Sequence, residues 1–367
     1  MSKPSLVEFE RRLHVKFINS LDSDQSSFEY FMSVPMRMGG CYWAVTAAKS
    51  LAISIGDPIF EKARDFVLSC YNTDGGFSVD VGHDSSITAT HYALLVVSQT
   101  GGLKGLVCHR KTWKFLRALQ LENGSFSGDR WGETDLRFAY DAIAIACILG
   151  ESKCDESCQY CRCDECEQDA SIRIPDLCSY VLSCRNSDGA FAPSPGGESH
   201  AAYTYCALAS LDIAHLCFGM SEIATPESTA FWLASRQTAH GGFNGRPEKA
   251  PDVCYSWWIY ASLKILDFYG LGKPIQGELV DQQISCRFSS WISKSSLVDF
   301  ILKAQDLETG GVSDRPGYAP DIFHTFFGIA ALSLLEPELG LDRIDPTFAV
   351  PESVAANWRQ GGMNEDY

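Results

Sequence analysis

Apolar and polar positions follow a unit that recurs along the chain. In each copy, apolar residues recur every three or four positions, and a turn with glycine before phenylalanine or valine follows. This spacing puts the apolar side chains on one face of a helix, and glycine ends a helix because it adopts the left-handed conformation cheaply. The five copies are 66–70 with 74–77, 115–120 with 123–126, 180–184 with 188–191, 232–237 with 241–243, and 300–305 with 310–312.

A second segment follows each turn, and it is apolar nearly all round, which is typical of a buried helix. A sixth segment of this kind starts at Gly39 but has only a partial outer partner. Six pairs can close a ring, and no stretch shows the alternation of a strand. We therefore predict an all-α fold, a closed α/α toroid of six inner and about six outer helices, as one domain over 1–367. The five inner segments that follow the glycine turns are 91–97, 137–149, 200–213, 254–266 and 324–335.

The composition suits a large folded interior and argues against two classes of partner. Hydrophobic residues make up 46% of the chain, and its net charge of −16 disfavours nonspecific binding to nucleic acid or to an anionic membrane. Residues 1–14 are charged and lack an apolar core. No apolar run approaches the roughly 18 residues that a membrane span requires. We expect a cytoplasmic protein without a membrane span.

The 15 cysteines are interpreted as reduced thiols, because disulfides rarely persist in the cytosol. An acidic, cysteine-rich insertion at about 151–171 contains two C-x-x-C pairs that could bind a second, structural zinc. One residue between the pairs is tighter than the usual folded knuckle, so the alternative is a loop without metal. The cysteines of this insertion are Cys154, Cys158, Cys161, Cys163 and Cys166.

Polar residues stand early in successive inner segments, where a toroid would bring them to one end of its funnel. Helix amino termini carry partial positive charge, so we expect an anionic substrate group at that end. The residues in these positions are His91, Arg137, His200, Cys254 and His324.

Asp252, Cys254 and His324 offer oxygen, sulfur and nitrogen donors that suit zinc. Three protein ligands leave a fourth position open for a substrate, as in catalytic zinc sites. Each residue also has a simpler interpretation: Asp252 as a helix cap, Cys254 as a small core residue, and His324 as a hydrogen-bonded core histidine. The repeat aligns these positions and favours the metal.

A charged loop directly precedes two of these donors. Arg246 and Lys249 would place two cations beside the metal, and His200 and Tyr255 could donate hydrogen bonds to the same anion. A diphosphate fits this set. The alternative is a solvated loop in which the cations pair with Glu248.

Seven motifs, spread over nearly the whole chain, resemble those of one family, the beta subunits of protein prenyltransferases. Within this family they are most similar to the type II branch, the Rab geranylgeranyltransferases. The motifs are 36–43, 82–84, 124–133, 197–200, 245–258, 321–325 and 345–352.

The resemblance implies a toroid of six helix pairs with zinc on Asp252, Cys254 and His324. It also implies that four residues contact a prenyl diphosphate and stabilise the leaving group, while a zinc-bound substrate thiolate attacks the prenyl carbon. Asp314 matches an aspartate that binds magnesium in some relatives; otherwise it is an ordinary turn residue. The four diphosphate contacts are His200, Arg246, Lys249 and Tyr255.

The resemblance extends to the lipid. Gly39 stands where farnesyl-specific relatives carry a bulky aromatic residue, which favours geranylgeranyl diphosphate as the substrate. One more isoprene unit would contribute about 4 kcal/mol of burial in an open pocket. His91 replaces a leucine of the family pattern. The other expected substrate contacts are Tyr42, Trp43, Arg137, Tyr140, Trp258 and Phe323, although aromatic stripes are also common in plain cores.

The family works as a heterodimer with an alpha subunit, and type II enzymes receive Rab GTPases from a Rab escort protein. The resemblance therefore implies geranylgeranylation of carboxy-terminal Rab cysteines. Three alternatives stay open. A farnesyl or type I enzyme would act on a short carboxy-terminal peptide, a terpene cyclase would need an acidic initiating motif, and a noncatalytic toroid would have a broken site.

Overall fold

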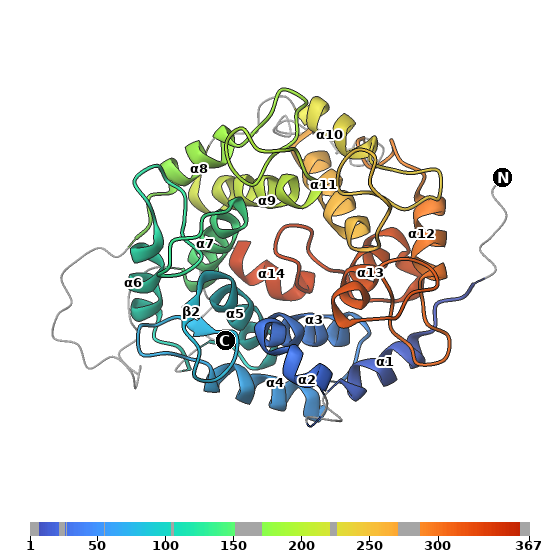
Figure 1. Cartoon of the computed structure of the whole chain (residues 1–367), viewed down its shortest axis with the longest axis horizontal. Helices are drawn as coiled ribbons and strands as arrows, with labels where there is room; N and C mark the ends of the chain where they lie inside the picture. Colours follow the sequence, from blue (N-terminus) through green and yellow to red (C-terminus); the bar gives the residue numbers. More distant parts are fainter. Residues whose placement is uncertain are drawn as a thin grey trace, which may run out of the picture.

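The chain forms a closed ring of helix pairs (Figure 1). The computed structural model describes residues 7–21, 26, 28–54, 56–103, 106–150, 171–220, 226–270 and 287–359. Each inner helix contacts the next, and the last contacts the first, which closes the ring and confirms the predicted α/α toroid. The inner helices are α3 (Arg37–Ser50), α5 (Ile87–Thr100), α7 (Leu136–Leu149), α9 (Ala201–Phe218), α11 (Cys254–Gly270) and α13 (Ile322–Leu335).

An outer helix packs on each inner helix. The partner of α3, which the sequence pattern revealed only in part, is the amino-terminal helix α1. The outer helices are α1 (Arg11–Ser20), α4 (Pro58–Ser69), α6 (His109–Leu119), α8 (Ile174–Ser183), α10 (Pro226–Ala234) and α12 (Lys294–Lys303). The short elements are α2 (Phe28–Met32), η1 (Val34–Met36), η3 (Pro337–Leu339), α14 (Glu352–Arg359), and the antiparallel pair β1 (Phe77–Ser78) and β2 (Ser85–Ser86).

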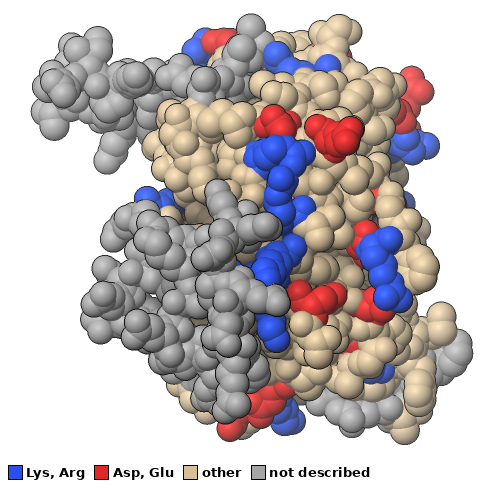
Figure 2. Space-filling model, turned by 90° about the vertical axis from the view of Figure 1, so that its left-hand side faces the viewer, with Lys and Arg blue, Asp and Glu red and all other residues tan. Residues whose placement is uncertain are grey.

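The outer helices are amphipathic, as the pattern predicts. In α6, Trp113, Leu116 and Leu119 are buried against the ring, whereas Lys114 on the same helix is exposed. Figure 2 shows the side of the molecule that carries α6, where Lys and Arg side chains form a line with Asp and Glu beside it. Although the chain has a negative net charge, this face is therefore not uniformly acidic.

The repeated glycine turns join neighbouring helix pairs. Four of the turns have one glycine with a positive φ, and the last turn has two, Gly310 and Gly311; the first such glycine of each turn has a φ between 79° and 94°. A Cβ added there would lie 2.1 to 2.7 Å from the nearest atom of the next outer helix, in every case a backbone atom. Gly310 meets Leu13 of α1 in this way, so the last turn seats the amino-terminal helix and completes the ring. The five glycines are Gly75, Gly124, Gly189, Gly241 and Gly310.

Helix α9 corrects one expectation from the sequence. Its 18 residues make it long and apolar enough, by length and composition alone, to cross a membrane. However, 67% of this window is buried inside the molecule, because an inner helix of a toroid contacts its neighbours on nearly every side. The apolar character of α9 is therefore explained by its place in the ring.

The carboxy-terminal segment lies inside the ring, with α14 in the middle of the view in Figure 1. Tyrosine hydroxyls from three inner helices hold it: Tyr42 donates to the carbonyl of Ala349, and Tyr140 and Tyr205 donate to that of Thr347. The cysteine-rich insertion lies outside the described residues, so the choice between a second zinc and a loop without metal stays open.

Candidate metal centre and anion site

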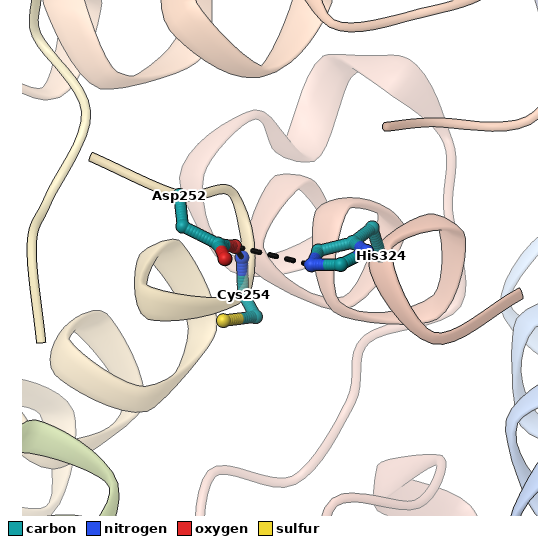
Figure 3. Close-up of side chains that lie close together, drawn as sticks. All are labelled: Asp252, Cys254 and His324. Carbon is teal, nitrogen blue, oxygen red and sulfur yellow. Dashed lines mark hydrogen bonds and ion pairs between the residues drawn. The ribbon is translucent and has the colours of Figure 1, made fainter. Parts of the chain in front are cut away.

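Asp252, Cys254 and His324 come together between the amino-terminal ends of two adjacent inner helices. Their ligand atoms all lie within 4.8 Å of one another. Figure 3 shows Asp252 pointing toward His324 on α13, with Cys254 at the start of α11 beside it. Nε2 of His324 lies 3.2 Å from Oδ1 of Asp252. The spatial cluster that the metal prediction requires is therefore present.

Asp252 caps the start of α11 and also lies in the cluster with His324. Its Oδ1 accepts a hydrogen bond from the backbone N–H of Cys254 at 2.8 Å, which is the geometry of a helix cap. The same carboxylate faces His324. The cap therefore orients the Asp252 carboxylate toward His324, and it does not prevent this carboxylate from acting as a metal ligand.

A residue without a predicted role, Asp321, completes the centre. Its Oδ2 lies 2.6 Å from Nδ1 of His324, and its Oδ1 caps α13 by accepting from the backbone N–H of His324. Histidine ligands usually donate from the second ring nitrogen to a carboxylate, which sets the tautomer. Asp321 thus directs Nε2 of His324 toward Asp252 and Cys254. The aspartate three residues before a histidine at a helix start was the available sequence signal.

The protonation of the cluster follows from burial and from its short contacts. Burial, reinforced by the charge of Asp252, raises the pKa of the Cys254 thiol well above its usual range. Burial opposes the imidazolium of His324, but hydrogen bonds to Asp252 and Asp321 outweigh it and raise the pKa to about 9. Burial likewise opposes the Asp252 carboxylate, yet the bonds from His324 and Cys254 lower its pKa overall. A metal ion would replace protons here.

The donor set fits zinc. Carboxylate oxygen, thiolate sulfur and imidazole nitrogen are its usual ligands, and three of them leave the fourth position of a tetrahedron open. Cys254 is buried, while Asp252 and His324 are partly exposed, so the cluster can be reached from one side. The carboxylate of Asp321 behind His324 is the supporting contact that zinc sites generally have.

Three of the four predicted diphosphate contacts lie close together beside this centre. Tyr255 follows Cys254 on α11, and its hydroxyl lies 3.3 Å from Nε2 of His200, the cap of α9. Arg246 forms an ion pair with Glu198, two residues before His200. Lys249 is exposed. Its role stays a prediction, as does the diphosphate itself.

The imidazole and phenol of this group are neutral hydrogen-bonding groups near neutral pH. Burial, with the nearby charge of Arg246, lowers the pKa of His200. Burial raises the pKa of Tyr255 to about 12, so its hydroxyl keeps its proton. Either group can therefore donate a hydrogen bond to an anion, and Arg246 supplies positive charge.

Arg137 is held at the start of α7 rather than left free. Its Nε donates to Oδ1 of Asp135 at 2.9 Å, and Asp135 also accepts from the hydroxyl of Tyr203 on α9. The bond with Asp135 raises the pKa of the Arg137 guanidinium. The side chain of Arg137 is nevertheless 52% exposed, so it can contact a ligand.

Four of the expected lipid contacts belong to a continuous series of aromatic rings across five inner helices, and two residues without a predicted role, Phe327 and Tyr205, complete it. Phe323 links the series to the candidate metal centre, because its ring centroid lies 5.0 Å from that of His324. Neighbouring ring centroids are 4.6 to 5.8 Å apart in the order Trp43, Phe323, Phe327, Trp258, Tyr205 and Tyr140. A role in binding lipid stays a prediction.

The space beside Gly39 is already occupied. A Cβ at this position would lie 3.0 Å from the ring of Trp43 and 3.4 Å from that of Tyr92, which stacks on Tyr42. Any side chain larger than glycine would therefore press on the aromatic wall that we expect the lipid to contact. Tyr92 was not among the predicted substrate contacts.

His91 lies in a buried polar group. Its Nδ1 is 2.8 Å from Oδ1 of Asp141 on α7, and the hydroxyl of Thr88 donates to the other oxygen of that carboxylate. Nε2 of His91 is buried and has no hydrogen-bond partner in the described part of the chain. His91, which replaces the leucine of the family pattern, therefore has Asp141 as its partner. Asp141 lies in α7, a helix that is otherwise almost entirely apolar.

Asp314, the possible magnesium ligand, lies near the centre but outside it. Its carbonyl accepts from the backbone N–H of Val253, directly before Cys254. Its carboxylate binds the guanidinium of Arg315 at 2.8 Å. A magnesium ion on Asp314 would compete with that ion pair, and its role stays a prediction.

Known proteins with the same fold match this chain over nearly its whole length. The family model of the prenyltransferase alpha-alpha toroid domain matches residues 9–350. Geranylgeranyl transferase type-2 subunit beta of Saccharomyces cerevisiae is 37% identical over 352 residues, which cover 95% of each chain. Geranylgeranyl transferase type-2 subunit beta 1 of Arabidopsis thaliana is 36% identical over 353 residues, covering 96% of each.

A solved structure has the same architecture. Candida albicans protein geranylgeranyltransferase-I complexed with GGPP superposes with a TM-score of 0.73, and the match covers 97% of this chain and 100% of that chain. The two are 19% identical in sequence, so this likeness shows the fold alone.

Proposed function

The chain belongs to the prenyltransferase alpha-alpha toroid family, and we propose that it is the catalytic beta subunit of a Rab geranylgeranyltransferase. It is a prenyltransferase by its family and relatives. The proposed reaction transfers the geranylgeranyl group from geranylgeranyl diphosphate to carboxy-terminal cysteine thiols of Rab GTPases. Support for the type 2 reaction comes from the names of relatives that match over nearly their whole length.

One observation carries the chemistry: donors for a thiol-binding metal and donors for an anion stand on the same helix start. Asp252 and Cys254 belong to the candidate metal centre, while the adjacent Tyr255 contacts His200 in the anion site. A thiol held at the first site and a diphosphate held at the second would be neighbours. Holding two reactants together in this way removes much of the entropic barrier to their reaction.

Asp252, Cys254 and His324 would hold the zinc. When bound, zinc would lower the pKa of a coordinated substrate thiol, about 8.5 when free, so that the thiolate is available at neutral pH. The substrate sulfur then bonds to the lipid carbon that carries the diphosphate, as the carbon–oxygen bond breaks and its electron pair leaves with the diphosphate. His200, Tyr255, Arg246 and Lys249 would stabilise the negative charge that grows on this leaving group.

The partners of the reaction belong to the same proposal. We expect an alpha subunit to complete a heterodimer and a Rab escort protein to present the Rab substrate. Magnesium, if it takes part, would bind through Asp314 after the ion pair with Arg315 opens. Trp43 and Tyr92, which occupy the space beside Gly39, would form the wall that meets the lipid near its far end.

The test is transfer of labelled lipid by the reconstituted heterodimer, with geranylgeranyl and farnesyl diphosphate each offered with two protein substrates. One substrate is a Rab protein bound to its escort protein, and the other is a short peptide with a single carboxy-terminal cysteine motif. We expect geranylgeranyl transfer to the escorted Rab. Transfer of farnesyl alone would reject the proposed lipid, and transfer only to the peptide would reject the Rab substrate.

A further inference from the structure

Two cysteines from adjacent inner helices meet at the helix ends opposite to those that carry the metal ligands. Cys147 lies in the last turn of α7 and Cys217 in the last turn of α9. Their sulfur atoms are 2.9 Å apart, although 70 residues separate them in sequence. The candidate metal centre lies at the opposite, amino-terminal ends of α11 and α13, so this thiol pair is a separate feature.

The two thiols differ in their access to solvent. Cys147 is 8% exposed, and its sulfur contacts the backbone carbonyl of Trp358 in α14. Cys217 is partly exposed. Cys217 is therefore the residue of the pair that a small oxidant would meet first, and the sulfur of Cys147 lies 2.9 Å behind it.

The environment of Cys217 favours its thiolate. The hydrogen bond between the two thiols lowers the pKa of Cys217 and raises that of Cys147, so Cys217 is the sulfur that loses its proton first. Burial and the charge of Asp212 oppose the Cys217 thiolate, whereas the guanidinium of Arg359 assists it. Thiolates, not thiols, react with peroxides and disulfides.

We propose that Cys147 and Cys217 are an oxidation site that forms a reversible disulfide with hydrogen peroxide. The Cys217 thiolate attacks one peroxide oxygen, which gives a sulfenic acid and, after protonation of the leaving oxygen, one water. The Cys147 sulfur then attacks the sulfenic sulfur, loses its proton, and releases a second water. Two thiols are oxidised by two electrons and one peroxide is reduced; a dithiol reductant reverses the change.

The bond would join two inner helices next to the carboxy-terminal helix. Arg359 of α14 binds Asp345 at 2.9 Å and approaches Asp212 of α9, so this end of the ring already carries contacts between α9 and α14. A cross-link that encloses 70 residues restricts the unfolded chain. The oxidised protein should therefore unfold at a higher temperature than the reduced protein.

The experiment uses the full-length chain, treated with stoichiometric hydrogen peroxide, alkylated, and digested without reduction. Mass spectrometry should find a peptide that joins residues 147 and 217, about 2 Da lighter than the two thiol peptides together, and dithiothreitol should remove it. The melting temperature should rise with the cross-link and fall again on reduction. Cys217→Ser and Cys147→Ser should each abolish both effects. Cys178→Ser, which removes a buried thiol of α8, should leave both intact.

The proposal is wrong if peroxide leaves both thiols free to alkylate, or if Cys217 stops at a sulfinic acid while Cys147 remains a thiol. A peptide joining either cysteine to a different one would also overturn it. These readouts do not depend on prenyl transfer, so they stand apart from the test of the proposed function.

Discussion

Nδ1 of His324 lies 2.6 Å from Oδ2 of Asp321, and this contact decides which imidazole nitrogen is available to a metal. A carboxylate at this distance accepts a hydrogen bond from Nδ1–H, so Nε2 is the nitrogen that faces Asp252 at 3.2 Å. The first turn of α13 therefore presents a histidine of fixed tautomer to the two donors on α11.

Replacing Asp321 should weaken zinc binding without removing the helix cap. Asparagine caps helices about as well as aspartate, so Asp321→Asn tests the charge behind His324 rather than the start of α13. We expect zinc affinity to fall about 10- to 100-fold in a chelator competition assay. Asp57→Asn, at the cap of the outer helix α4, is the matched control and should bind zinc normally. An unchanged affinity in Asp321→Asn would show that this contact does not support the metal.

Removing the sulfur donor should abolish both zinc binding and transfer. Cys254→Ala should lose the metal in elemental analysis and the activity of the reconstituted enzyme, while circular dichroism and lipid binding largely persist, because one ligand of three is lost from a ring that stays closed. Cys178→Ala removes a buried thiol from the outer helix α8 and should keep its zinc. Full activity of metal-free protein would contradict the zinc assignment.

The stability of the protein should depend on pH through His200. Burial lowers the pKa of this imidazole in the folded protein, so the unfolded chain binds more protons once the pH falls below about 6.5. Folding stability should therefore decrease from pH 7 toward pH 5.5, and the loss should level off below the folded pKa. His200→Asn keeps a capping side chain without a titrating ring and should lose less stability over this range in urea titrations. Equal slopes for both proteins would count against this pKa shift.

The glycine turns should be sensitive to a single methyl group. In Gly189→Ala, the new Cβ would lie 2.7 Å from the backbone of Ser228 and would also require a positive φ, so we expect a loss of about 2 to 5 kcal/mol of unfolding free energy. Gly196 has φ 78° but open space around it, so Gly196→Ala should cost only about 1 to 2 kcal/mol. If both variants lose the same unfolding free energy in denaturant titrations, the contact with α10 is not what excludes a side chain at Gly189.

The cysteine-rich insertion should not add a metal ion. One residue between its C-x-x-C pairs leaves little chain for a zinc knuckle, so we expect one zinc per chain by elemental analysis, with or without residues 151–170. A content of two ions that falls to one on deletion would identify a second, structural site.

Much of the fold follows from local pattern. Apolar spacing and glycine turns predict five helix pairs and the ring, because each pair must bury an apolar face against its neighbours. The partner of α3 could not be found in this way: α1 lacks a glycine turn of its own, and Gly310, nearly 300 residues later, seats it. A contact between the two ends of a chain leaves no local signal.

The sequence by itself determined the ring of helices and the three donors, since helix periodicity, glycine conformation and ligand chemistry are properties of the residues. Only the tertiary structure decided that Asp321 orients His324, that Trp43 and Tyr92 fill the space beside Gly39, and that Cys147 meets Cys217. Side-chain direction and the approach of distant helices depend on how the whole ring packs. The metal prediction required the donors to meet; packing brings them within 4.8 Å.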